Sequence, residues 1–263
     1  MNTFNRAGAN LHFAVSGDDE GPVLVFSNSL GTDFRIWDQV IARLPATLRI
    51  VRYDKRGHGL SDVGTGPWGM ADHVADLAGL LDHLGVRNAI VCGLSVGGMI
   101  TQGLAAERPD LVKAMILCDT GAKIGTADMW QERVEAVRRS GIDAMADAVM
   151  ERWFTDEFRR SDPTFPIWRN MLCRTPAEGY ARTCAAIAET DLIESTSRLR
   201  LPCVGICGDK DLATPPDLVR ETAELVPGAQ FQLIRGAGHI PCVEQPDAMT
   251  DAIKAFLSDL GVI

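Results

Sequence analysis

A single serine lies among small residues in the segment Gly93-Leu94-Ser95-Val96-Gly97 and fits the pattern G-x-S-x-G. The segment follows an apolar run and precedes a helical pattern, which is the strand-to-helix context that this pattern requires. Glycines around the serine let neighbouring backbone approach closely, so the hydroxyl can project at the carboxyl edge of a sheet. The spacing therefore predicts that Ser95 is a nucleophile; the alternative is a glycine-rich turn with an incidental serine.

A nucleophilic serine needs a base that is oriented by an acid, and on this type of turn the acid and then the histidine follow the serine along the chain. His239 follows three small residues after an apolar run and is predicted to be the base. Two carboxylates, Asp209 and Asp211, share the loop after the apolar run 202–208. We favour Asp211 because the loop needs a few residues to carry a carboxylate across to the histidine, and we expect Asp209 to brace the turn.

Among the other histidines, His58 is the competitor for the role of base. It lies in a glycine-punctuated loop after an apolar run, where Asp54 and Arg56 are expected to brace a packed turn. His73 and His83 are expected on the polar face of a helix. Chain order favours the histidine that comes after the acid.

Acyl transfer also requires hydrogen-bond donors for the oxyanion that develops on the substrate. One predicted donor is the main-chain N–H of Val96, which directly follows the serine. The second should come from the loop after the apolar run 23–27, which reads Asn28-Ser29-Leu30-Gly31. We expect the Leu30 N–H to be this donor because Gly31 allows the backbone to turn inward; the alternative is a plain turn.

The elements that position these residues are short, continuous apolar runs that alternate with helical patterns. Continuous runs are typical of strands buried on both faces, and the alternation predicts the α/β class with a mostly parallel sheet flanked by helices. Residues 11–17 are expected to form an outer, antiparallel strand. The other runs are 23–27, 48–53, 89–93, 114–119, 202–208 and 231–234, and the clearest helical patterns are 70–85, 99–111 and 216–228.

The alternation breaks between about Lys123 and Arg198, where the sequence is amphipathic with helical spacing and has no strand pattern. It resumes at Leu201. We therefore predict an α/β core made of residues 1–121 and 199–263, with residues 122–198 inserted as a helical cap, or lid, over a pocket.

Composition narrows the possible partners. A formal net charge of −9 without a basic cluster argues against nucleic-acid binding, and it means that any site for an anion must be built locally. No apolar stretch is long enough to cross a bilayer, and the first residues contain no signal-peptide pattern, so we expect a soluble, cytoplasmic protein with no membrane partner. Seven cysteines without a CxxC pair indicate reduced, buried thiols.

From its first strand to its last helix the chain resembles the α/β-hydrolase family. The motifs that carry this resemblance are RYDKRGHGLSD (52–62), GLSVGG (93–98), GDKD (208–211) and GAGHIP (236–241). Within the family the chain is most similar to 3-oxoadipate enol-lactonases, enzymes of protocatechuate and catechol breakdown. That similarity rests on FSNSLGTDFRIWD (26–38), GLSVGGMI (93–100) and ERWFT (151–155).

The resemblance implies hydrolysis of 3-oxoadipate enol-lactone to 3-oxoadipate through an acyl-enzyme. Ser95 would attack the lactone carbonyl while His239, steadied by Asp211, removes its proton. The amides of Leu30 and Val96 would hold the oxyanion. The leaving group is an enol that can tautomerise to a ketone, and no metal or organic cofactor is required.

The implied substrate is a small anionic lactone, so a cationic side chain should bind its free carboxylate. Of the arginines in the predicted cap we favour Arg133 or Arg152, with Trp153 as an apolar wall or as packing between cap and core. The alternatives are another serine hydrolase on the same scaffold (a carboxylesterase, a perhydrolase-like enzyme or a C–C bond hydrolase) and a non-catalytic ligand-binding protein. The sequence gives no indication of the oligomeric state.

Overall fold

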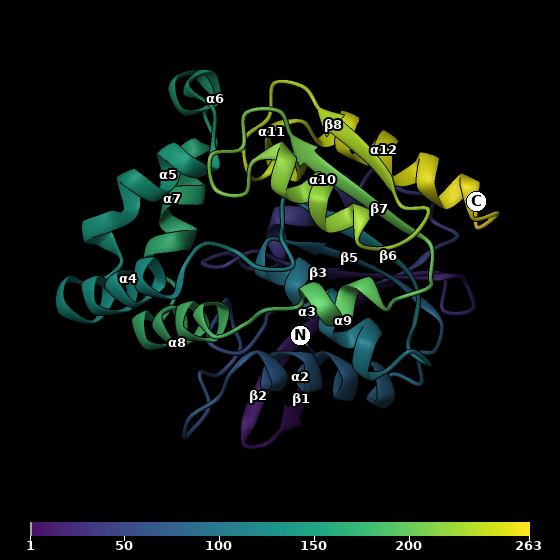
Figure 1. The fold of residues 1–263 in the computed structure, drawn as a ribbon, viewed down its shortest axis with the longest axis horizontal. Helices are drawn as coiled ribbons and strands as arrows, with labels where there is room; N and C mark the ends of the chain where they lie inside the picture. Colours follow the sequence, from purple (N-terminus) through teal and green to yellow (C-terminus); the bar gives the residue numbers. More distant parts are fainter. Residues whose placement is uncertain (1) are drawn as a thin grey trace.

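Eight strands form one sheet in the order β1-β2-β4-β3-β5-β6-β7-β8 in the computed structural model, which describes residues 2–263 (Figure 1). The pairs β1–β2 and β2–β4 are antiparallel, and all the others are parallel. The predicted α/β class with a mostly parallel sheet is therefore confirmed. The strands are β1 (Asn2–Arg6), β2 (Ala9–Gly17), β3 (Val23–Ser27), β4 (Arg49–Tyr53), β5 (Ala89–Leu94), β6 (Val112–Cys118), β7 (Cys203–Gly208) and β8 (Gln230–Ile234).

The edge of the sheet differs from the prediction. Residues 11–17 lie in β2, which is antiparallel to β4 as expected, but β2 is not the outer strand. The outer strand is β1, and the sequence pattern missed it because β1 has only one apolar side chain, the half-buried Phe4, among polar residues. An edge strand has one unpaired side and needs no continuous apolar run.

Helices cover both faces of the sheet, so β5 and β7 are buried along their whole length. On one side α2 and α3 pack together, and another group is formed by α1, α11 and α12. These elements bring the ends of β5, β6, β7 and β8 to one edge, where the loops that follow them meet. The helices outside the insertion are η1 (Phe34–Trp37), α1 (Asp38–Ile41), α2 (Met70–His83), α3 (Val96–Glu107), α10 (Pro216–Glu224), α11 (Pro241–Glu244) and α12 (Pro246–Asp259).

We call residues 122–198 the helical insertion, because the chain between β6 and β7 contains helices and no strand. In Figure 1, α4 to α8 gather at one end of the sheet, whereas α9 lies beside α3. The Thr196 hydroxyl of α9 donates to the side-chain oxygen of Gln102 at 2.9 Å. The insertion contains α4 (Ala127–Ser140), η2 (Asp143–Met145), α5 (Ala146–Trp153), α6 (Asp156–Ser161), α7 (Phe165–Cys173), α8 (Ala177–Ala188) and α9 (Ile193–Ser197).

None of the helices within residues 2–263 is both long enough and apolar enough to span a bilayer.

Candidate active site

Ser95 lies on the turn between β5 and α3 with a backbone φ of 59° and ψ of −120°. This conformation is strained for a residue with a side chain. The surroundings hold it from both sides: the Ser95 N–H donates to the carbonyl of Cys118 at 2.9 Å, and the Ser95 carbonyl accepts from the Thr120 hydroxyl at 2.6 Å. The serine is thus fixed at the sheet edge.

The glycines of the motif are needed for close packing. A Cβ atom on Gly93 would lie 2.2 Å from the carbonyl oxygen of Gly97, and one on Gly97 would lie 2.2 Å from the carbonyl oxygen of Ser27. Real Cβ contacts do not reach these distances, so neither position accepts a side chain unless backbone moves. The pattern G-x-S-x-G therefore follows from the sterics of the turn.

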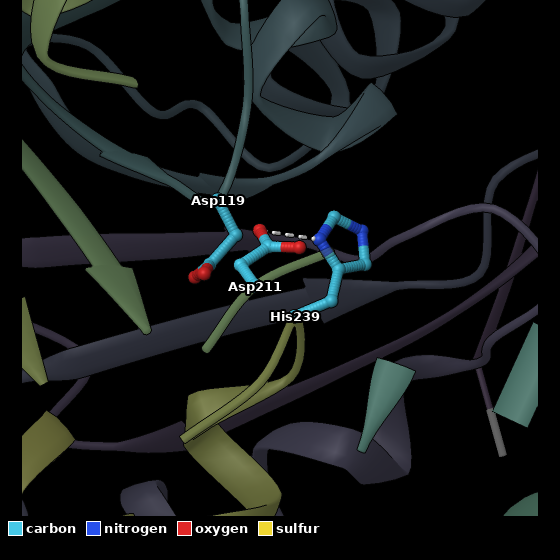
Figure 2. Close-up of side chains that lie close together, drawn as sticks. All are labelled: Asp119, Asp211 and His239. Atoms are coloured by element: carbon cyan, nitrogen blue, oxygen red, sulfur yellow. Dashed lines mark hydrogen bonds and ion pairs between the residues drawn. The ribbon is translucent and has the colours of Figure 1, made fainter. Parts of the chain in front are cut away.

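Asp211, after β7, and His239, after β8, form a buried hydrogen-bonded pair. The Asp211 Oδ2 atom lies 2.9 Å from the His239 Nδ1 atom (Figure 2). The Asp211 carboxylate also accepts from the N–H groups of Ala213 (2.7 Å) and Thr214 (3.1 Å) and from the Thr214 hydroxyl (2.7 Å). Burial alone would raise the pKa of Asp211, but the charge and hydrogen bond of His239 and these donors lower it below its usual value. An ionised Asp211 can only accept, so Nδ1 donates to it and Nε2 remains free to accept a proton.

Asp209 does not approach the histidine. Its Oδ1 atom accepts a hydrogen bond from the Gly236 N–H at 2.8 Å, which ties the loop after β7 to the loop after β8. The two carboxylates of this loop therefore have different partners, and the side chain that meets His239 is that of Asp211.

Asp119, which follows β6, is a third buried carboxyl group that the sequence analysis did not single out. Its Oδ1 atom accepts from the Gly208 N–H at 2.9 Å, while its Oδ2 atom is buried without a hydrogen-bond partner. Ligand-type atoms of Asp119, Asp211 and His239 all lie within 4.8 Å of one another (Figure 2). Burial and then the charge of Asp211 raise the pKa of Asp119 well above its usual value, so the site favours the protonated form of this group.

This cluster does not have the character of a cation site. Both Asp211 oxygens already accept hydrogen bonds and His239 Nδ1 donates one, so of the two carboxyl groups only the second oxygen of Asp119 lacks a hydrogen bond. The sequence could have indicated that Asp119 lies near the site. The apolar run 114–119 ends with this aspartate, and the carboxyl end of that strand lies at the same edge of the sheet as Ser95.

Ser95 and His239 line one cavity of about 290 Å³ between the sheet edge and the helical insertion. Their side chains form no hydrogen bond to each other within the part of the chain that the structure describes. Such contacts often tighten only when a ligand binds, so the shared cavity is the relevant relationship. The lining residues are Ser29, Leu30, Ser95, Ile124, Gly125, Met129, Trp130, Arg133, Val149, Arg152, Trp153, Tyr180, Ala213, Thr214, Pro215, Leu218 and His239.

The main-chain N–H groups of Leu30 and Val96 donate no hydrogen bond to any residue from 2 to 263. Both residues are buried, Leu30 beside the cavity and Val96 at the first position of α3. Buried N–H groups without an acceptor are rare, because each one forfeits a hydrogen bond. Both N–H groups are thus left without a hydrogen bond within the described residues, and their role as oxyanion donors stays a prediction.

Arg133 of α4 and Arg152 of α5 line the cavity and are both half-buried. Neither forms an ion pair with a carboxylate in residues 2–263, whereas Arg138 pairs with Glu178 and Arg169 pairs with Asp147 on the surface. Burial and then the charge of Arg133 lower the pKa of Arg152, which means that the two guanidinium groups repel each other across this site. An anion between them would relieve that repulsion.

Trp153 lines the cavity and is buried, and its main chain holds the histidine loop. Its carbonyl oxygen accepts from the His239 N–H at 2.8 Å. Glu244 adds a second link, because its carboxylate accepts from the Thr155 N–H (2.8 Å), the Thr155 hydroxyl (2.7 Å) and the Gly238 N–H (2.5 Å). The end of α5 and the loop that carries His239 are therefore joined.

The remaining histidines lie outside this cavity. His58 is fully buried and contacts the carbonyl of Arg56. In the loop that contains His58, the Asp54 side chain accepts from the Leu60 N–H at 3.0 Å and so braces the loop, as expected. Arg56 instead pairs with Asp76 of α2 at 2.6 Å.

The placement of His73 on a polar helix face is wrong: the side chain is fully buried and lies 3.4 Å from the Thr183 hydroxyl of α8. The face of α2 that looked polar is covered by the helical insertion. His83 is exposed, as expected.

Comparison with known proteins agrees with this architecture. Residues 23–252 match the model of the alpha/beta hydrolase family. The chain is 35% identical over 256 residues to 3-oxoadipate enol-lactonase 2 of Acinetobacter baylyi, covering 97% of this chain and 96% of that protein. It superposes on the crystal structure of the enol-lactonase from Burkholderia xenovorans LB400 with a TM-score of 0.94 and 36% identity, over 98% of this chain and 100% of that one.

A thermophilic esterase from Thermogutta terrifontis, solved with malate bound, has a TM-score of 0.89 and 30% identity, over 95% of this chain and 94% of that one. The chain belongs to the alpha/beta hydrolase family. It is accordingly an enzyme of the hydrolase class, and the resemblance inferred from its motifs is confirmed.

Proposed function

We propose that the protein hydrolyses 3-oxoadipate enol-lactone to 3-oxoadipate with Ser95, His239 and Asp211 as a catalytic triad. The observation that carries this proposal is one cavity of about 290 Å³ lined by the serine, by the paired histidine and by two arginines that pair with no carboxylate of residues 2–263. A small lactone with a free carboxylate matches both features. The similarity to two enol-lactonases, at 35% and 36% identity, supports this substrate class.

In the acylation step the Ser95 oxygen attacks the lactone carbonyl carbon while Nε2 of His239 takes the hydroxyl proton. Asp211 holds the imidazole through Nδ1 and stabilises the imidazolium that forms. The free N–H groups of Leu30 and Val96 donate to the tetrahedral oxyanion, a contribution of about 10²–10³ in rate for one such donor. When the carbonyl re-forms, the ring C–O bond breaks and His239 returns the proton to the enol oxygen.

The enol product remains attached to Ser95 through the new ester, because a lactone is cyclic. A water molecule that loses its proton to His239 attacks this ester, and a second tetrahedral intermediate uses the same two N–H donors. Collapse releases the second carboxylate and returns the proton to Ser95. The enol tautomerises to a ketone, which draws the overall reaction forward.

The free carboxylate of the substrate is bound by Arg133 and Arg152 in this proposal. Hydrogen bonds between guanidinium and carboxylate are charge-assisted and directional. Trp153 forms an apolar wall of the cavity, and residues 122–198 act as a cap over it. The resemblance to the enol-lactonases supports a place in protocatechuate and catechol degradation in the cytoplasm, with no cofactor.

A carboxylesterase activity is the second candidate, supported by the similarity to the Thermogutta terrifontis esterase. The test is ultraviolet-monitored loss of the enol-lactone beside hydrolysis of neutral aryl esters, by the wild type and by Ser95→Ala. We expect the enol-lactone to have the higher kcat/KM and the Ser95→Ala variant to be inactive on both. Cleavage of aryl esters alone would reject the lactone and keep the hydrolase, whereas no turnover and no labelling of Ser95 by a fluorophosphonate would indicate a ligand-binding protein.

A further inference from the structure

Lys55, the second residue after β4, has a buried amino group that the proposed reaction leaves without a role. Its side chain is only 1% exposed, which is rare for lysine. No carboxylate of residues 2–263 forms an ion pair with it. Its Nζ atom instead donates to two consecutive main-chain carbonyl oxygens in the loop after β3, those of Asn28 (3.3 Å) and Ser29.

The second of these bonds constrains the predicted oxyanion donor. The carbonyl of Ser29 and the N–H of Leu30 belong to one trans peptide unit. In a planar trans peptide the C=O and the N–H point in opposite directions. A donor that holds the Ser29 carbonyl therefore directs the Leu30 N–H away from Lys55.

The same peptide is held by a further donor. The Thr32 hydroxyl donates to the Ser29 carbonyl at 2.9 Å, and Gly31 adopts a φ of 72° that turns the chain between them. Ser29 and Leu30 line the cavity that also contains Ser95. The side of the peptide opposite Lys55 is thus the side available to a ligand, and the Leu30 N–H there has no protein acceptor.

We propose that Lys55 is a positioning residue that holds the Ser29–Leu30 peptide with the Leu30 N–H directed at the oxyanion. This inference rests on the proposed acyl-transfer chemistry but not on the choice of substrate, because every ester or lactone forms the same oxyanion. Lys55 touches neither the substrate nor the reacting atoms. It acts through the carbonyl group on the far side of the peptide.

The charges around Lys55 are consistent with a hydrogen-bonding role. Burial lowers the pKa of Lys55 to about 7, against the carboxylates of Asp54 and Asp33, which raise it. His58 and His73 face the same region, and burial together with the charge of Lys55 lowers the pKa of each. Because both the ammonium and the neutral amine carry N–H donors, the bond to Ser29 does not depend on which form is present.

The test is Lys55→Met, which keeps an unbranched side chain one atom shorter than lysine and removes the donor. We expect kcat for both an aryl ester and the enol-lactone to fall by about 10²-fold, the effect of losing one oxyanion donor, with little change in KM. Affinity for a boronic acid that forms a tetrahedral adduct with Ser95 should fall by a similar factor, while affinity for the product 3-oxoadipate stays the same.

The matched control is His73→Leu, which alters a buried basic residue of the same region that has no hydrogen bond to the loop. We expect it to reduce stability and to leave kcat and boronate affinity unchanged. If Lys55→Met does not fold, Thr32→Val removes the other side-chain donor to the Ser29 carbonyl and should show the same split between kcat and KM.

Two results would overturn the proposal. One is a folded Lys55→Met variant with wild-type kcat and boronate affinity. The other is an equal loss of boronate and product affinity, which would mean a general distortion of the cavity. A wrong substrate assignment would give a different result from a wrong role for Lys55. The wild type would then fail to hydrolyse the enol-lactone, but the comparison of the wild type with Lys55→Met on an aryl ester would still test the role of Lys55.

Discussion

The N–H of His239 donates to the carbonyl oxygen of Trp153 at 2.8 Å, so the loop that carries the proposed base is bound to the end of α5. Glu244 reinforces this link by accepting hydrogen bonds from Thr155 and Gly238. The position of the imidazole therefore depends on the helical insertion as well as on the sheet.

We predict that Glu244→Ala lowers both stability and kcat. The substitution leaves three donors of Thr155 and Gly238 without an acceptor, and each buried group left unpaired costs about 1–3 kcal/mol. Urea unfolding and steady-state kinetics measure the two effects. Glu244→Gln keeps one acceptor oxygen, so its stability and its kcat should lie between those of Glu244→Ala and of the wild type. An unchanged kcat in both variants would contradict the proposed dependence of the imidazole position on the helical insertion.

Asp119→Asn should make the protein more stable at neutral pH than the wild type. The folded-state pKa of Asp119 is raised, so the folded protein keeps a proton that the unfolded chain releases above about pH 4. Below that pH the protonated Asp119 contributes fully to the stability of the wild type. As the pH rises toward the folded-state pKa, this contribution is lost by at most about 1.4 kcal/mol per pH unit.

The asparagine variant lacks this titration. Denaturant unfolding at a series of pH values should show the difference between the variant and the wild type growing with pH. A difference that stays constant from pH 4 to pH 8, or that grows in the other direction, would mean that Asp119 is ionised in the folded protein.

Arg152→Met is predicted to raise KM for the anionic lactone and to leave the kinetics of a neutral aryl ester unchanged. Hydrogen bonds to charged groups contribute about 1.5–3 kcal/mol, which corresponds to about a 10- to 100-fold change in affinity. Arg169→Met is the control, since that side chain pairs with Asp147 on the surface. Equal effects on the charged and the neutral substrate would argue against a carboxylate site.

Ser95→Gly should be more stable than Ser95→Ala, although both are inactive. The φ of 59° strains any residue with a Cβ atom, and such strain amounts to about 1–3 kcal/mol. Part of this gain is offset because glycine also has more freedom in the unfolded chain. Thermal and urea unfolding of the two variants measure the difference, and the opposite order would show that the turn is not strained.

Most of the sheet was predictable because its strands are buried on both faces and so read as continuous apolar runs. The runs 23–27 and 89–93 correspond closely to β3 and β5. β1 was missed because it is polar and half exposed, and its place is determined by pairing with β2 rather than by burial.

Chain order and loop position sufficed to expect Ser95 and His239 close together, and the structure places both at one cavity; their catalytic roles stay predictions. The choice between Asp209 and Asp211 depended on loop length alone. The roles of Asp119 and Lys55 depend on which atoms face them across the fold, and a sequence pattern contains no such information. His73 was misplaced because its helix face is covered by α8, a contact distant in sequence.

The two arginines of the cavity have a consequence for turnover as a whole. Hydrolysis of the proposed substrate converts one negative charge into two, and the cavity is lined by two guanidinium groups that pair with no carboxylate of residues 2–263. Under the proposed function, the dicarboxylate product therefore matches the charge of this cavity better than the substrate does. We therefore expect the dicarboxylate to inhibit the reaction as a product.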